Sequence, residues 1–270
     1  MSFSYEKNYR VCAQWEGRPE SPPGGAARII RMLENLGRCR PGFDRWTELG
    51  FTRREAAVPF STMPPQIGPM IRRLEIARMC DPEGRPIPEL GYHLSAATAA
   101  LGIHAALAAF IDYAPSPQKA LPNRVDITLS YETEPERQSI TVELLQASLL
   151  AVIDAWEPAT GSVVPYGLSR LLPADGGPSR PPRFSAGWVT YLAPPFAPLI
   201  TPPAATAAER MPDGGLLIWA TRDRFDGENA AHVAAVAAVQ AALRPLDDIA
   251  WPPENYLRRD PSSPVPEATR

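Results

Sequence analysis

The sequence has little lysine, histidine or cysteine. Only Lys7 and Lys119 are lysines among its 27 basic residues, and the 270-residue chain holds three histidines and three cysteines. The cysteines, Cys12, Cys39 and Cys80, are odd in number and lack Cys-x-x-Cys spacing, which argues against a disulfide framework or a zinc knuckle. The formal net charge of −3 argues against a general nucleic-acid binder. We therefore expect no metal, no cofactor and no direct binding of nucleic acid.

The sequence also lacks a long hydrophobic run. Acidic residues such as Glu6 and Glu16 interrupt the first twenty residues, so these do not have the pattern of a secretory leader. The nearest approach to a membrane span, residues 96–113, is rich in alanine and contains His104 and Asp112, whereas a span needs about 20 strongly apolar residues. These absences predict a soluble, cytoplasmic protein with no membrane partner.

The patterns of common catalytic sites are missing as well. None of the histidines, His93, His104 and His232, has another histidine three or four residues away, as a helix-borne metal site would. No Gly-x-Ser-x-Gly nucleophile elbow occurs, and the Gly-Gly pairs at 176–177 and 214–215 are typical of turns. We therefore expect no enzyme. The alternative is a hydrolase or transferase with an unrecognised site around His93 or His232.

Proline, in contrast, is abundant: 33 of 270 residues is about 12%, more than twice the usual ~5%. Many prolines gather in residues 172–183, 194–203 and 252–266, between segments with regular apolar spacing. This spacing predicts helices beginning near residues 22, 52, 66, 139 and 227, and strands at residues 9–15, 91–99, 103–113, 124–131, 163–164, 187–192 and 216–221. The order predicts an α+β fold with helices packed on a largely antiparallel sheet. We expect a single domain over residues 1–251 and a loosely ordered tail over residues 252–270.

Some local predictions concern the helices. In the first one, the apolar stripe leaves Arg28, Arg31 and Glu34 on the exposed side. Ser139 is expected to begin the helix that ends before Pro158. Asp226 has the character of an N-cap and is expected to begin the last helix.

Charge is segregated along the chain. Residues 28–54 contain seven arginines and three acidic residues, a local excess of four positive charges. Residues 126–143 contain five acidic residues and one arginine, a local excess of four negative charges. Glu132, Glu134 and Glu136 belong to the acidic stretch and follow a predicted strand. They form either a solvated loop or an acidic patch for a basic partner, where complementary charge speeds encounter and sets specificity.

The order of aromatic and glycine landmarks resembles that of a known family. The landmarks are Trp15-Glu16-Gly17-Arg18, Phe43-Asp44-Arg45-Trp46, Gly187–Leu192, Gly214–Thr221, Phe225-Asp226 and a closing helix that carries His232. Together they span residues 9–245 and resemble the immunity protein 52 family of bacterial polymorphic-toxin systems. Members are encoded beside toxins, often nucleases of the restriction-endonuclease-like class, including type VI secretion effectors.

The resemblance implies an α+β protein that binds and neutralises a cognate toxin in the cytoplasm of the producing cell. It carries over no list of toxin contacts, because immunity surfaces diverge with their toxins. The charge pattern therefore selects the candidate contacts, which are Tyr131, Glu132, Glu134 and Glu136, with the proline-rich loops as alternatives.

Two mechanisms of inhibition fit this expectation. The carboxylates plug the basic cleft that a nuclease needs for its substrate, or the protein covers a neighbouring surface and blocks assembly or substrate entry. A net charge of −3 favours the second, because a full mimic of DNA would be far more acidic. A different class of function, an adaptor in a secretion apparatus, is a further alternative.

Overall fold

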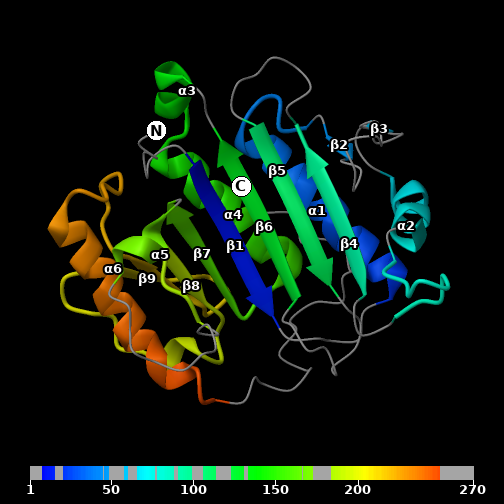
Figure 1. Ribbon diagram of the computed structural model, residues 1–270. Coiled ribbons are helices and arrows are strands. Elements are labelled where there is room, and N and C mark those ends of the chain that lie inside the picture. Colours follow the sequence, from blue (N-terminus) through cyan, green and yellow to red (C-terminus); the bar gives the residue numbers. More distant parts are fainter. Residues whose placement is uncertain are drawn as a thin grey trace.

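Ten described strands join into one antiparallel sheet that runs through the molecule (Figure 1). The computed structural model describes residues 8–15, 21–44, 46–48, 58–59, 66–76, 78–87, 91–98, 106–113, 123–130, 133–165, 167–172 and 184–249. The strands are β1 (Asn8–Trp15), β2 (Thr47–Glu48), β3 (Val58–Pro59), β4 (Tyr92–Ala97), β5 (Ala106–Tyr113), β6 (Asn123–Ser130), β7 (Thr160–Pro165), β8 (Val189–Leu192), β9 (Ala207–Arg210) and β10 (Leu216–Trp219). Their spatial order is β3-β2-β4-β5-β6-β1-β7-β8-β10-β9, with every described pairing antiparallel.

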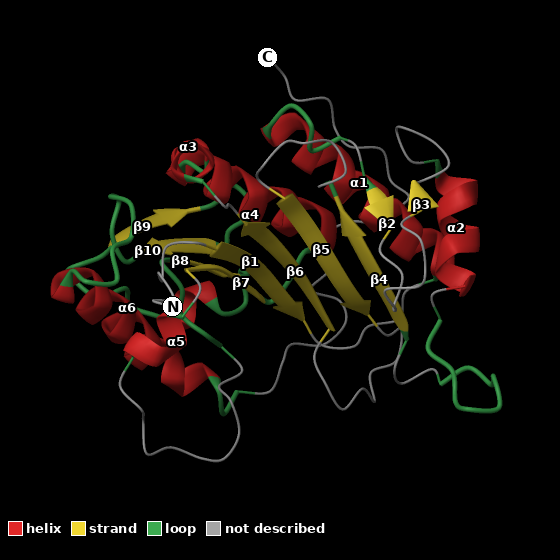
Figure 2. Cartoon of the chain, turned by 45° about the horizontal axis from the view of Figure 1, so that its top comes forward, coloured by secondary structure: helices red, strands yellow, loops and turns green. Residues whose placement is uncertain are grey.

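Six described α-helices flank the sheet on both of its faces (Figure 2). They are α1 (Pro22–Cys39), α2 (Ile67–Ile76), α3 (Glu134–Ser139), α4 (Val142–Trp156), α5 (Leu168–Leu171) and α6 (Ala230–Leu243). Helices α1 and α4 lie behind the central strands in the view of Figure 1, whereas α6 lies in front of the β8–β10 end. The predicted α+β fold, with helices packed on an antiparallel sheet, is confirmed.

Strand β1 occupies a central position, between β6 and β7. Successive side chains of a strand point to opposite faces of the sheet, and the period-two pattern of β1 follows this rule. The face toward α4 holds the buried residues Tyr9, Val11, Ala13 and Trp15. The other face holds Asn8, Arg10, Cys12 and Gln14, which are half-buried or exposed. The sheet therefore has an apolar back face and a polar front face at this point.

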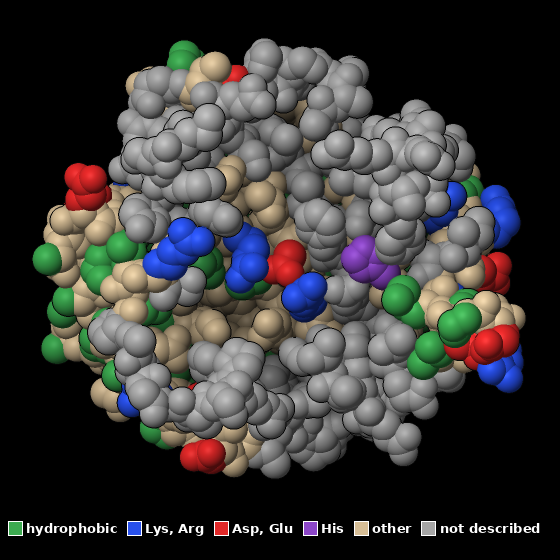
Figure 3. Space-filling model, viewed as in Figure 1, with side chains coloured by type: hydrophobic (Ala, Val, Ile, Leu, Met, Phe, Trp, Pro, Cys, Tyr) green, Lys and Arg blue, Asp and Glu red, His purple; other side chains and the backbone are tan. Residues whose placement is uncertain are grey.

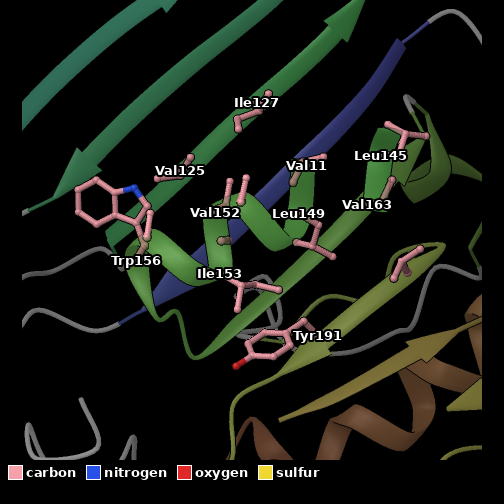
Figure 4. Packing of buried hydrophobic residues seen from close by; sticks show 14 of the residues in the cluster. Val11, Val125, Ile127, Leu145, Leu149, Val152, Ile153, Trp156, Val163 and Tyr191 are labelled. Atoms are coloured by element: carbon pink, nitrogen blue, oxygen red, sulfur yellow. The ribbon is translucent and has the colours of Figure 1, made fainter. Parts of the chain in front are cut away.

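Helix α4 supplies the apolar stripe that covers the back face (Figure 4). Leu149, Val152 and Trp156 of this helix point toward Val11 of β1 and the neighbouring strand residues. The Trp156 ring stacks on Trp15, with ring centroids 5.0 Å apart. All of these side chains are at most 2% exposed. Because buried apolar area is the main favourable term in folding, this layer is the principal core of the protein.

Side-chain caps fix where the two back helices begin. The Ser21 hydroxyl accepts the Gly24 N–H at 3.2 Å at the start of α1. The Thr141 hydroxyl accepts the Leu144 N–H at 3.2 Å at the start of α4. Each cap satisfies a backbone donor that has no partner inside its helix. The prediction that Ser139 begins the second of these helices is wrong, because Ser139 is the last residue of the separate helix α3.

Arg28 is a second correction, because it was predicted on the exposed side of α1. Its side chain is buried, and its Nη1 donates to the Ala155 carbonyl at 2.8 Å and lies 3.4 Å from Glu157 Oε2. Both partners belong to the C-terminal end of α4, where carbonyls without helical partners and the helix dipole favour a cation. Arg28 therefore ties α1 to the end of α4.

Helix α6 is anchored to the front of the sheet by apolar and amide contacts. Val236, Val239 and Leu243 are its buried residues. The Gln240 amide accepts the Ala186 N–H at 2.8 Å and donates to the Phe184 carbonyl at 3.0 Å. These two bonds tie α6 to the segment that leads into β8.

The start of α6 is a third correction. Asn229, not Asp226, caps this helix, and its side-chain oxygen accepts the Ala231 N–H at 3.0 Å. Asp226 lies in the preceding turn, where its carboxylate accepts the Glu228 N–H.

Other differences from the sequence predictions are local. The predicted helix near residue 52 and the predicted tail at residues 252–270 lie outside the described residues. Strand β9 was not predicted, because its sequence Ala-Ala-Glu-Arg lacks apolar alternation and three of its four residues are exposed at the sheet edge. The predicted strand pair over residues 91–113 is confirmed as β4 and β5.

Candidate partner-binding surface

The candidate contacts selected from the acidic stretch lie at and after the end of β6. Tyr131 and Glu132 lie outside the described residues, and Glu134 is the first residue of α3. Glu136 is 8% exposed, and its carboxylate accepts the Thr133 N–H at 3.1 Å. This contact reaches back across the first turn of α3, as the acidic residue of a capping box does. Glu136 therefore has a role in the start of its own helix.

The histidines do not assemble into a catalytic arrangement in the described part of the chain. His232 Nδ1 accepts the Asp226 N–H at 3.1 Å, and its ring lies 6.0 Å from that of Phe225. These contacts hold the turn that leads into α6. His93 is half-buried on β4, and His104 lies outside the described residues. No group of three His, Cys, Asp or Glu side chains suited to a metal ion occurs among the described residues.

The polar front face of β1 and β6 carries a charged cluster that sequence reasoning missed. The register of these strands places Cys12 opposite Asp126, Gln14 opposite Arg124 and Arg10 opposite Thr128. The Arg10 Nε lies 3.5 Å from Asp126 Oδ1, and the Arg124 Nε lies 3.4 Å from Asp126 Oδ2. One half-buried carboxylate is thus flanked by two arginines, one on each of its oxygens.

Exposure distinguishes the members of this cluster. The Arg10 and Arg124 side chains are 54% and 51% exposed, whereas Asp126 is 14% exposed. Figure 3 shows basic side chains on both sides of an acidic one across the middle of the front face. We call the cluster of Arg10, Arg124 and Asp126, with its strand neighbours Gln14 and Thr128, the arginine face.

The thiol of Cys12 lies beside this cluster, on the β7 side. Its Sγ is 3.2 Å from Ser162 Oγ. Burial raises the pKa of the Cys12 thiol, and the opposing effect of nearby Arg10 is smaller. Because the thiolate is the reactive form, a raised pKa argues against Cys12 as a nucleophile. The chemistry of this face is therefore ionic and hydrogen-bonding.

The signal for the arginine face is present in the sequence only as alternation. In the first strand, Arg10 lies between the apolar residues Tyr9 and Val11. In the other strand, Arg124, Asp126 and Thr128 alternate with Val125 and Ile127. This pattern assigns each charged residue to the polar side of its strand. The pairing of β1 with β6, which brings those sides together, joins segments far apart in the sequence.

Several aromatic landmarks of the family resemblance, among them Trp15, Phe43 and Trp188, belong to the core. The backbone at Gly187 passes so close to the Val163 carbonyl that a Cβ would collide with it. Trp188 is buried, and its indole N–H donates to the Thr221 carbonyl at 2.9 Å. These residues shape the junction of β7, β8 and β10.

None of the described helices combines the length and apolar character needed to cross a bilayer.

Comparisons with known proteins agree with this architecture. No curated protein matches the chain. Among solved structures, the Pseudomonas aeruginosa T6SS protein PA0821 is similar, with a TM-score of 0.50 and 15% sequence identity over 87% of this chain and 74% of that chain. This likeness shows a shared fold. The sequence model for immunity protein 52 matches residues 7–247. Because that match covers most of its length, the chain belongs to the immunity protein 52 family.

Proposed function

We propose that this protein binds and neutralises a cognate toxin by forming a tight protein–protein complex in the cytoplasm of the cell that produces both. The observation that carries the proposal is the family match over residues 7–247. The fold shared with a type VI secretion protein supports a toxin delivered by that system. The toxin is a nuclease of the restriction-endonuclease-like class, and the type VI effector TseT is one candidate.

The protein acts by occupying a surface of the toxin, without catalysis. His232 and Asp226 hold the turn before α6, which gives both residues a structural role. A net charge of −3 is too small for a general mimic of DNA. We therefore favour inhibition that covers a surface beside the toxin's active cleft and blocks assembly or substrate entry.

Rescue from toxicity tests this function directly. The toxin encoded beside this gene is expressed in a host cell with and without this protein, and the purified pair is analysed by size-exclusion chromatography and titration calorimetry. We expect restored growth and one stable complex. H93A and H232A should protect as well as the wild type does if they remain folded. Toxicity that persists, or no complex between the purified proteins, would contradict the proposal.

The acidic segment, Tyr131, Glu132, Glu134 and Glu136, is proposed to steer the toxin into place. Complementary charge mainly raises the association rate, so E132K/E134K/E136K should slow association about tenfold and leave dissociation nearly unchanged. Stopped-flow mixing at low and high salt measures this effect. E132K/E134K serves as the companion variant, because it leaves the Glu136 contact with Thr133 intact.

A matched control changes the same charge elsewhere. E34K/E209K/E228K reverses three exposed glutamates on other parts of the described surface and should affect association less. Unchanged neutralisation and association in E132K/E134K/E136K would remove the acidic segment from the interface.

A further inference from the structure

We propose that a projecting hairpin, residues 78–87, is the segment of this protein that enters the toxin, and that it occupies a recess lined by basic side chains. The proposal rests on the proposed function and adds the contact segment and the chemistry of the partner site. The hairpin lies between α2 and β4 in the chain and is separate from the acidic segment that follows β6.

The hairpin extends away from the body of the protein. In Figures 1 and 2 the chain between α2 and β4 projects outward near the β4 end of the sheet. None of the residues from 78 to 87 is buried, and seven of the ten are exposed. The Ile87 N–H donates to the Met79 carbonyl at 2.9 Å and joins the two legs of the hairpin. Its tip, residues 81–85, is therefore accessible to a partner.

The tip is held in one shape by its own polar groups. The Asp81 N–H donates to the Arg85 carbonyl and the Gly84 N–H donates to the Asp81 carbonyl, each at 2.9 Å. The Asp81 carboxylate accepts the Arg85 N–H at 2.8 Å and the Arg85 Nε–H at 2.7 Å. Gly84 has a φ of +81°, a conformation that favours glycine. A tip that is already ordered loses less conformational entropy when a partner binds, which favours affinity.

Folding does not account for this ordered tip. The Arg85 side chain is 74% exposed, and ion pairs between exposed side chains contribute little to stability. A Cβ placed at Gly84 would meet no atom within 4 Å beyond its chain neighbours, in the part of the chain that the structure describes. The tip therefore adds little to the core, whereas its order and exposure suit a contact element.

The charge of the tip selects the kind of partner. Glu83 is 64% exposed, and its carboxylate accepts an Arg85 Nη2–H at 2.9 Å. One arginine thus faces two carboxylates, those of Asp81 and Glu83, so the tip has a formal charge of −1. Arg78 belongs to the base of the hairpin, where it donates to Tyr92 Oη at 3.1 Å. A recess lined by basic side chains matches the charge of the tip.

A nuclease offers such a recess. A protein that acts on nucleic acid neutralises phosphates with lysine and arginine side chains, so the entrance to its cleft is basic. A hairpin that enters there blocks the substrate while the rest of the protein covers the neighbouring surface. In this arrangement Glu83 supplies a carboxylate that accepts charge-assisted hydrogen bonds from the toxin.

The test compares Glu83 with a matched glutamate. The full chain and the toxin encoded beside it are purified, and Kd is measured by titration calorimetry. E83K should weaken binding about 100-fold and E83Q about tenfold, because the first adds repulsion in a basic recess and the second only removes attraction. E209K is the control, since Glu209 is 55% exposed beside an arginine at the other end of the sheet, and it should change Kd less than about threefold.

The native Cys80 thiol gives a second measurement that needs no substitution. Cys80 is exposed beside the tip, whereas Cys39 on α1 is half-buried. Alkylation by iodoacetamide is followed at each cysteine by mass spectrometry, in the free chain and in the complex. We expect Cys80 to react at least about tenfold more slowly in the complex, because the toxin removes its exposure, and Cys39 to react at nearly the same rate in both.

The outcomes are distinct. Circular dichroism and thermal unfolding establish that E83K and E83Q are folded. Wild-type affinity in E83K, or unchanged alkylation of Cys80 in the complex, would overturn the role of the hairpin and leave the proposed function standing. No complex with the wild-type chain would overturn both. Protection of Cys80 in the chain alone at rising concentration would assign the hairpin to a second copy and overturn the proposal.

Discussion

The side chains on the two sides of strand β1 differ in their burial and in their neighbours. On its back side, Val11 and Trp15 are fully covered by α4 and neighbouring strands. On its front side, Arg10 is 54% exposed and lies 3.5 Å from Asp126, which Arg124 also approaches. The same eight residues thus build the core with one set of side chains and present charge with the other. The two sides of a single strand can therefore differ in how much they contribute to stability, and the predictions below compare buried positions with exposed ones.

The largest expected effect on stability comes from the back side. Leu149 of α4 is fully buried, so L149A should lower the free energy of unfolding by about 3 kcal/mol through lost burial and a residual cavity. Q14A, on the front side of β1, should change it by less than about 0.5 kcal/mol. Urea unfolding measures both. Equal losses in the two variants would contradict the separation of the two sides.

Arg28, which is buried behind the sheet, and Arg10, which is exposed on its front, should also differ in their contribution to stability. R28A removes a buried cation from the end of α4 and leaves Glu157 and the Ala155 carbonyl without it, so it should cost about 2 kcal/mol. Because Glu157 is 16% exposed, water limits the loss. R10A should cost less than about 0.5 kcal/mol, as exposed ion pairs do. A small loss in R28A would show that this buried pair is dispensable.

The smallest effect concerns the helix on the front of the sheet. N229A removes the cap of α6 and should cost about 1 kcal/mol. D226A should cost less, because the Asp226 side chain serves only the turn that precedes the helix. The urea concentrations at the unfolding midpoints of N229A and D226A measure this difference in stability. A larger loss in D226A would restore the prediction made from the sequence.

How far the sequence determined these features depends on the range of the interactions. The strand at β1 and the helix at α4 are predicted from local apolar periodicity, and both elements are confirmed. The role of Arg28 could not be predicted, because its partners lie on α4, far along the chain. Its position beside the apolar stripe of α1 is compatible with either side of the helix until α4 is packed against it.

The candidate surface shows the same limit. A run of like charges, as in Glu132, Glu134 and Glu136, is visible in the sequence, but a helix cap that buries Glu136 forms only through backbone geometry. The arginine face has no such run. Arg10 and Arg124 become neighbours through the register of β1 and β6, which depends on the whole sheet.

The most direct test of the central claim measures Kd for the toxin encoded beside this gene, together with the free energy of unfolding, in the wild type and in L149A. We predict one tight complex for the wild type. We also predict that L149A loses about 3 kcal/mol of stability and, measured where it is folded, keeps the wild-type Kd. No complex between the toxin and the wild type would contradict the claim.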